Sequence, residues 1–195
     1  IRIDIDAKIE ATPKPFGRTI VEYGSSITQG ASASRPGMLY TARLARNAGF
    51  HFINLGLSGR GKMEKEVANM IADIEADAYV MDCAANPNAE EITERTAYMV
   101  RKIRKEHPTA PIIMIESVVR DSGLFNLSIK EFEKKKREAF KTEYDKLIRN
   151  GFKNLHLIEG THLLGSDHEA TIDGIHPNDI GFDRMIKVIQ PRILE

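Results

Sequence analysis

Short apolar runs alternate with longer amphipathic stretches along most of the chain. Four such runs are each followed by a stretch in which apolar residues recur at spacings of three and four, with charged residues between them. This alternation is typical of a parallel β-sheet whose two faces are covered by helices. The predicted strands span residues 19–23, 51–55, 78–82 and 112–115, and the predicted helices span residues 39–48, 62–75, 90–107 and 130–150.

The later part of the chain carries weaker signals of the same kind. A fifth run, at residues 154–158, alternates apolar with polar positions and is predicted to be an edge strand. Asn150 and Gly151 are suited to ending the helix before them, because glycine readily adopts the left-handed conformation found beyond helix C-termini. A last helix, at residues 182–188, is expected to stop before Pro191, which has no backbone N–H to donate.

The first eighteen residues differ from the rest of the chain. Ile1, Ile3 and Ile5 alternate with charged residues, which is typical of a half-buried strand, and prolines then interrupt the pattern. We therefore divide the chain into a strand and linker at residues 1–18 and one domain at residues 19–195. The length suits a single three-layer α/β/α core with a parallel sheet of about five strands.

Composition narrows the classes of partner. Lys and Arg together number 28, and Asp and Glu together also number 28. No overall electrostatic attraction to nucleic acid is therefore expected, and a small neutral substrate fits this balance of charge better. No apolar run approaches the roughly 20 residues that span a bilayer. Cys83 is the only cysteine, which rules out an internal disulfide. The charge run at residues 134–137 lies among acidic residues of the same predicted helix, and we interpret it as a solvated face.

Residues capable of chemistry follow three of the predicted strands. In open parallel sheets, ligands bind beyond the carboxyl ends of the strands, so the segments that come next are the first to search. These segments are Gly24-Ser25-Ser26-Ile27-Thr28, Gly56-Leu57-Ser58-Gly59-Arg60-Gly61 and Cys83-Ala84-Ala85-Asn86.

A fourth segment supplies what a serine nucleophile needs. Asp173-Gly174-Ile175-His176 places a carboxylate three positions before an imidazole, among turn-forming residues. A serine hydroxyl is a poor nucleophile until a base takes its proton, and that base needs a carboxylate to fix its tautomer. Ser26, His176 and Asp173 are therefore predicted to form a catalytic triad. The candidate donors to the tetrahedral oxyanion are the backbone N–H groups of Ser26 and Gly59 and the side-chain amide of Asn86.

Taken together, these segments resemble the SGNH hydrolases, also called the GDSL family. Gly24-Ser25-Ser26-Ile27 is similar to the family's Gly-Asp-Ser-Leu block, residues 54–59 to its glycine block, Asn86 to its asparagine, and residues 173–176 to its Asp-x-x-His block. Two positions depart from the pattern. Ser25 replaces the usual aspartate, and Ala84-Ala85-Asn86-Pro87 stands where the family has Gly-x-Asn-Asp. Each block alone is short, so their order and their placement after strands carry the resemblance.

The resemblance implies a flavodoxin-like three-layer fold and a serine esterase. It implies that Ser26 is the nucleophile, that Asp173 and His176 complete the triad, and that Ser26, Gly59 and Asn86 form the oxyanion hole. It implies no metal and no organic cofactor. Residues 23–30 and 173–181 are similar to an acetylhydrolase-like subgroup. This likeness favours acetyl esters, including those on carbohydrates, as well as a periplasmic or secreted location and an upstream β-sandwich domain whose tail would be residues 1–18.

Two other classes of protein stay open at this point. Gly56, Gly61 and Lys62 have the spacing of a phosphate-binding loop, and Asp82 ends an apolar strand as a metal-binding aspartate does in nucleotide-binding proteins. Met63 argues against this interpretation, because it stands where a Ser or Thr hydroxyl must coordinate magnesium. The second alternative is a flavodoxin-like binding module that performs no catalysis.

Overall fold

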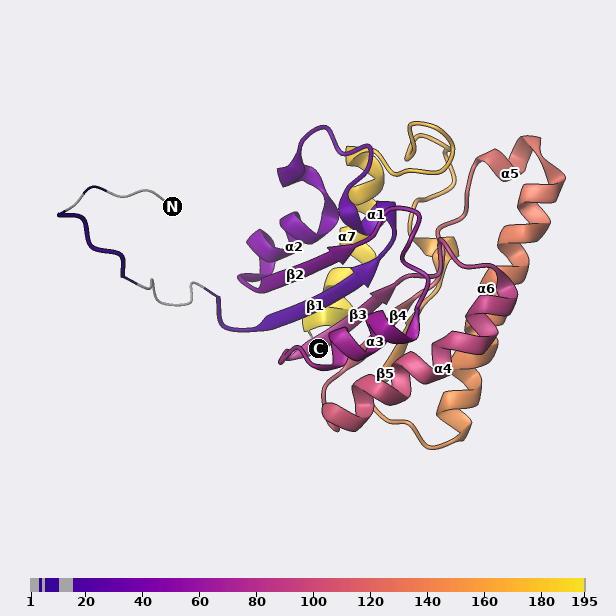
Figure 1. The fold of residues 1–195 in the computed structure, drawn as a ribbon. Coiled ribbons are helices and arrows are strands. Elements are labelled where there is room, and N and C mark those ends of the chain that lie inside the picture. The colour runs from indigo at the N-terminus through magenta and orange to yellow at the C-terminus, as the bar shows by residue number, and fades with distance from the viewer. Residues whose placement is uncertain (1–3, 5, 11–15, 195) are drawn as a thin grey trace.

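The computed structural model describes residues 4, 6–10 and 16–194 (Figure 1). The strand pattern of Ile1, Ile3 and Ile5 lies outside the described residues. The described chain forms one parallel five-stranded sheet with the strand order β2-β1-β3-β4-β5. Its strands are β1 (Thr19–Gly24), β2 (His51–Gly56), β3 (Ala78–Asp82), β4 (Ile112–Ile115) and β5 (Leu155–Ile158).

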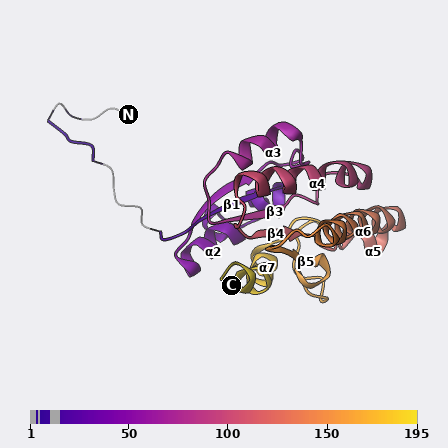
Figure 2. The ribbon, with the colours of Figure 1, turned by 90° about the horizontal axis from the view of Figure 1, so that it is seen from below.

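Helices cover both faces of the sheet and so create three layers (Figure 2). One face carries α2 (Tyr40–Ala48) and α7 (Asp179–Leu194), and the other carries α3 (Lys65–Ala72), α4 (Ala89–Glu106) and α6 (Leu127–Arg149). Ile20 and Val21 are adjacent in β1 but belong to different apolar clusters, because successive side chains of a strand point to opposite faces. Among the described residues, no helix is both long and apolar enough to cross a membrane.

The predicted fold class and all five predicted strands are confirmed. Each strand agrees with its predicted bounds to within one residue, and β5 lies at an edge of the sheet as expected. Gly151 also ends α6 as predicted, with a φ of +83° and a hydrogen bond from its N–H to the carbonyl of Ile148. The short segments α1 (Ser26–Gln29) and α5 (Ser122–Phe125), and 3-10 turns at Pro36–Met38 and Gly160–His162, were not predicted.

Three helix predictions are wrong at their ends, and one of them is α6, which begins at Leu127 rather than at residue 130. α7 does not stop before Pro191 but runs through it to Leu194. Ile189 and Ile193 flank this proline and are buried in the core, so packing holds the last turn although one backbone donor is missing. The helix predicted at residues 62–75 begins later, at Lys65. The reason is that Met63 adopts a left-handed φ of +58° and is fully buried.

The interpretation of residues 134–137 as a solvated face is wrong at Lys136 and holds only in part at Arg137, which is half-buried. Lys134 and Lys135 are exposed, whereas Lys136 is only 1% exposed. Lys136 shares the inward face of α6 with Glu133 and Phe140, which stand three positions before it and four after it. The buried face of α6 therefore includes charged residues, so the spacing of apolar residues alone does not predict which residues form that face.

Two glycines allow the ends of β1 and β2 to approach α1, and a third allows the loop after β2 to approach the end of β1. A Cβ atom at Gly24 would overlap the hydroxyl of Thr28, and one at Gly61 would overlap the carbonyl oxygen of Gly24. A Cβ atom at Gly56 would overlap the backbone nitrogen of Gln29. The backbone segments around Ser26 therefore pack more closely than residues with side chains allow.

Gly56→Ala is expected to lower the free energy of unfolding by about 3 kcal/mol, because its methyl group meets backbone atoms that cannot turn aside. Urea denaturation followed by circular dichroism measures the change. Gly49→Ala is the control. Gly49 has a φ of +67° but nothing within 4 Å of its Cβ position, so only backbone strain of about 1 kcal/mol is expected. Equal losses in the two variants would contradict the steric explanation.

Candidate active site

Ser26 stands at the carboxyl end of β1, as the first residue of α1. Ser25 before it is buried, and its hydroxyl accepts a hydrogen bond from the backbone N–H of Ile27 at 3.1 Å. Gly30 ends the short helix with a φ of +94°. Ser25, which replaces the aspartate of the family pattern, therefore caps α1 and leaves Ser26 partly exposed.

The structure brings Ser26, His176 and Asp173 into one hydrogen-bonded chain. The Oγ atom of Ser26 lies 3.0 Å from Nε2 of His176, although 150 positions separate the two residues. On the other side of the ring, Nδ1 lies 2.7 Å from Oδ2 of Asp173. A proton on Nδ1 donated to this carboxylate leaves Nε2 free to accept the proton of Ser26.

Asp173 is held in its charged form. Partial burial raises the pKa of its carboxyl group. The backbone N–H and side chain of His176 and the backbone N–H of Ile175 outweigh that effect and lower the pKa to about 2. Both backbone bonds reach Oδ1, at 2.7 Å from His176 and 2.9 Å from Ile175. Oδ1 of Asp173 thus stabilises the loop conformation through backbone hydrogen bonds, while Oδ2 faces the imidazole of His176.

Asp121, which the sequence reasoning missed, connects this loop to the segment after β4. Its two carboxylate oxygens lie 2.8 Å from Nδ1 of His168 and 3.2 Å from the hydroxyl of Thr171. The next residue, Ser122, donates its backbone N–H to the carbonyl of Gly174, between Asp173 and His176. Asp121 lies in the segment after the fourth predicted strand. A search of the segment beyond the carboxyl end of that strand, as was made for the first three strands, would have drawn attention to it.

Gly59 and Asn86 lie on loops that follow the two strands beside β1. Gly59 is exposed, with a φ of +68° and open space around its Cβ position. The side-chain oxygen of Asn86 is buried and has no hydrogen-bond partner among the described residues. Asn88, not Asn86, caps α4, accepting a hydrogen bond from the backbone N–H of Glu91 at 2.8 Å. The amide of Asn86 is therefore not used as a helix cap.

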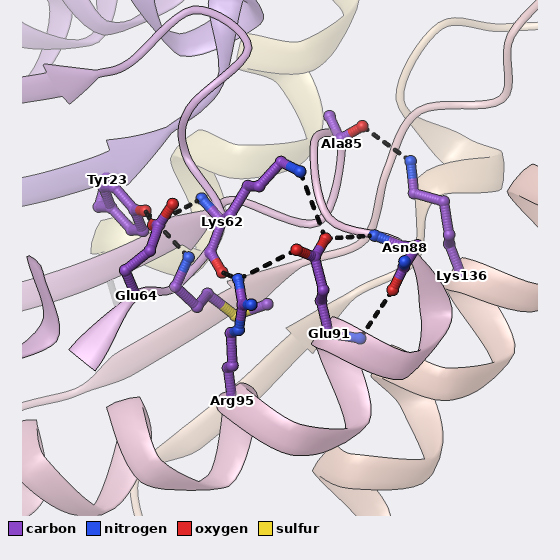
Figure 3. Close-up of polar contacts among 9 residues, drawn as sticks. Tyr23, Lys62, Glu64, Ala85, Asn88, Glu91, Arg95 and Lys136 are labelled. Atoms are coloured by element: carbon purple, nitrogen blue, oxygen red, sulfur yellow. Dashed lines mark hydrogen bonds and ion pairs between the residues drawn. The ribbon is translucent and has the colours of Figure 1, made fainter.

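Glu91 joins these two loops, as Figure 3 shows. Its Oε2 atom accepts a hydrogen bond from the backbone N–H of Asn88 at 3.0 Å and lies 3.5 Å from Nζ of Lys62. Arg95 lies 3.3 Å from the other carboxylate oxygen and also donates to the carbonyl of Lys62 at 3.2 Å. The loop that carries Gly59 and the loop that carries Asn86 are thereby linked through one carboxylate.

A buried acidic network lies beneath α1. The hydroxyl of Tyr40 is 2.5 Å from Oε1 of Glu22 and 2.6 Å from Oδ2 of Asp82, and Thr28 donates to the same oxygen of Asp82 at 2.7 Å. Tyr40 has one proton and can donate to only one carboxylate, so the other bond requires a protonated acid. Burial raises the pKa of Asp82 to about 6 and that of Glu22 well above its usual value. The second oxygen of Glu22 is buried without a partner in the described structure, which favours Glu22 as the protonated acid.

The same contacts do not favour the nucleotide-binding alternative. Asp82 is buried in the network with Tyr40 and Thr28, where it cannot reach a metal ion bound to a nucleotide. Lys62 is paired with Glu91, and Gly61 packs against the backbone of Gly24. No group of three or more His, Cys, Asp or Glu residues in the described part of the chain is arranged to hold a metal ion.

Known proteins show similarity along nearly the whole chain. The model of the GDSL-like lipase/acylhydrolase family matches residues 17–194. A crystal structure of a Bacteroides ovatus protein described as a GDSL-like lipase superposes with a TM-score of 0.90 and 53% sequence identity. That match covers 98% of this chain and 57% of that chain, so this chain spans little more than half the length of its relative. No curated protein matches the chain.

More distant solved structures share the fold. A family two carbohydrate esterase from Clostridium thermocellum, in complex with cellohexaose, has 17% identity and a TM-score of 0.71 over 95% of this chain and 66% of that chain. A two-domain esterase active on acetylated mannans has 20% identity and a TM-score of 0.65 over 90% of this chain and 48% of that chain. The match of the family model to residues 17–194, with a relative at 53% identity, shows that this chain belongs to the GDSL-like lipase/acylhydrolase family.

Proposed function

We propose that this chain is a serine esterase that hydrolyses small acyl esters, with Ser26 as nucleophile and His176 and Asp173 completing the triad. The observation that carries the proposal is the continuous hydrogen-bonded chain from Ser26 through His176 to Asp173. The contact between Ser26 and His176 has the length and the atom pairing that proton transfer requires. The contact between His176 and Asp173 is a hydrogen bond that fixes the tautomer of the imidazole.

The proposed reaction is a two-step acyl transfer. Ser26 Oγ attacks the ester carbonyl carbon while Nε2 of His176 takes the hydroxyl proton, and the carbonyl oxygen becomes an oxyanion. Collapse of this intermediate breaks the bond to the alcohol oxygen, which leaves with the proton from His176. Water then attacks the acyl-enzyme with His176 again acting as base, and the acid is released as Ser26 recovers its proton. Asp173 stays ionised throughout and stabilises the imidazolium.

Three donors are proposed for the oxyanion: the backbone N–H groups of Ser26 and Gly59 and the side-chain amide of Asn86. Each fixed donor of this kind lowers the barrier by about 3 kcal/mol. The strand order supports this set of donors. Ser26 follows β1, and the loops of Gly59 and Asn86 follow β2 and β3, which lie on either side of β1 in the sheet. The amide nitrogen of Asn86 is the donor in this proposal, and its side chain is not used to cap α4, because Asn88 has that role.

Acetyl esters on carbohydrates are the proposed substrates. Two proteins that share the fold are named as esterases of carbohydrates, one as a carbohydrate esterase and one as an esterase active on acetylated mannans. The balanced charge of the chain suits a neutral sugar ester. Assays of the intact protein on acetylated sugars and on aryl esters of increasing acyl length would test both parts of this assignment.

The nucleophile is tested directly with an aryl acetate and an active-site serine phosphonate. Ser26→Ala is expected to reduce kcat by about 10⁴-fold or more and to abolish covalent labelling, because it removes the hydroxyl that is aligned with His176. Ser128→Ala is the matched control, since Ser128 is exposed on α6, and it should be labelled and turn over like the parent protein. Unchanged turnover by Ser26→Ala, or no turnover and no labelling of folded parent protein, would refute the proposal.

A further inference from the structure

Lys136 is buried in a place where a lysine is costly. It is 1% exposed, whereas Lys134 and Lys135 beside it are exposed to solvent. Burial lowers the pKa of its ammonium group to about 8, with Glu133 acting in the opposite direction, so the group remains largely protonated at neutral pH. An ammonium group removed from water requires strong compensating contacts. The identity of those contacts therefore indicates what the residue does.

The ammonium of Lys136 is directed at the loop after β3. It donates to the carbonyl oxygen of Ala85 at 2.7 Å, as Figure 3 shows. It also donates to the two carboxylate oxygens of Glu133, at 3.0 and 3.3 Å. Arg120 donates to the same Ala85 carbonyl at 2.9 Å and lies 3.2 Å from Glu133. One backbone carbonyl thus accepts hydrogen bonds from two cations, and Glu133 pairs with both of them.

The Ala85 carbonyl belongs to the peptide unit that continues into Asn86. Because a peptide unit is planar, two fixed donors at its oxygen set the orientation of the bond from which Asn86 extends. Pro87 restricts the backbone of Asn86 from the other side, and Asn88 begins the capped helix α4. The oxygen of Asn86 has no partner among the described residues, so the backbone rather than a bond to that oxygen must direct this amide.

A purely stabilising role does not account for this arrangement. A buried ion pair can often be replaced by apolar groups of similar size without loss of stability. Here the pair of Lys136 and Glu133 is oriented so that the cation reaches a backbone carbonyl on another element, 51 positions away in the sequence. The contact connects α6 to the loop proposed to supply an oxyanion donor.

We propose that Lys136, assisted by Arg120, is a positioning residue that holds the Ala85 carbonyl and thereby aims the amide of Asn86 at the oxyanion. This inference rests on the proposed esterase function. Lys136 does not touch substrate in this proposal. It acts through the peptide unit between Ala85 and Asn86, so its effect must depend on the presence of the Asn86 amide.

The test compares Lys136→Met in two backgrounds, the parent protein and Asn86→Ala, by aryl acetate kinetics. In the parent protein, kcat should fall by about 30-fold with KM unchanged to within about twofold, because a transition-state donor is misplaced. In the Asn86→Ala background, the same substitution should change kcat by less than about twofold, because the donor is already absent. Lys135→Met makes the same chemical change on the exposed face of α6 and should leave both constants unchanged.

The outcomes separate positioning from general structural damage. An equal fall of kcat in both backgrounds, or no fall in the parent protein, would overturn the inference. If Lys136→Met does not fold because Glu133 loses a partner, the double variant Glu133→Gln, Lys136→Met removes both charges, and the same comparison with Asn86→Ala decides the question. Failure of the esterase proposal is distinguishable, because the parent protein itself would then show no turnover and no labelling of Ser26.

Discussion

Asp173→Asn is expected to lower kcat for an aryl acetate by about 10⁴-fold while the loop keeps its conformation. The asparagine oxygen can still accept the two backbone hydrogen bonds that Oδ1 of Asp173 accepts from Ile175 and His176. The amide nitrogen would then face Nδ1 of His176 and donate to it, which moves the ring proton to Nε2. In that tautomer the imidazole cannot accept the proton of Ser26. Steady-state kinetics, with circular dichroism to check the fold, measure the loss.

Asp121→Asn provides a matched control for this effect. Asp121 also pairs with a histidine and belongs to the same group of loops, but its carboxylate oxygens bond to His168 and Thr171 rather than to His176. Its replacement should lower kcat by less than about 10-fold, through small displacement of the loop. Comparable losses in the two variants would mean that any Asp–His contact in this region matters to the loop and that Asp173 has no special part in proton transfer.

Tyr40→Phe is expected to lower the free energy of unfolding at pH 7 by about 4 kcal/mol, the largest stability change anticipated for one removed atom in this protein. The lost hydroxyl bridges Glu22 and Asp82, which are 0% and 4% exposed. Phenylalanine would leave both acids buried without this partner and the ring otherwise in place. Urea denaturation of the two proteins measures the difference.

Glu22→Gln is the counterpart of that variant and should be tolerated. The glutamine amide can donate to the hydroxyl of Tyr40 as the protonated Glu22 does, and the hydroxyl can still donate to Asp82. Stability as low as that of Tyr40→Phe would show that Glu22 is charged in the folded protein.

The pH dependence of stability follows from the same proton. The folded-state pKa of Glu22 is raised, so the folded protein keeps a proton that the unfolded chain releases above its usual value of 4.5. Its contribution to stability is complete below that value and declines as the pH rises toward the folded-state pKa, by up to about 1.4 kcal/mol per pH unit. Glu22→Gln removes this slope, so the variant should gain stability relative to the parent protein over the pH range that begins at about 4.5 and extends up toward the raised pKa of Glu22. Denaturation midpoints across that range measure the gain.

The strands and the order of the candidate groups along the chain could be predicted because they depend on local pattern. A parallel strand buried on both faces is a short apolar run, so residues 78–82 and 112–115 were located to the residue. Ser26, His176 and Asp173 could be selected because each stands in a turn-forming segment and because a serine nucleophile requires an imidazole base and a carboxylate.

Tertiary packing alone decided the features that local pattern could not contain. Whether Pro191 ends a helix depends on the apolar residues around it that pack against the core, and these residues keep α7 intact. Whether Lys136 faces water or the Ala85 carbonyl depends on which side of α6 meets the loop after β3. The amino-acid sequence of α6 does not predict which side that is. Residue type and spacing therefore determined the strands and the candidate groups of the site. The folded sheet determined the distances between those groups, because contacts between segments 150 positions apart exist only after the whole core has formed.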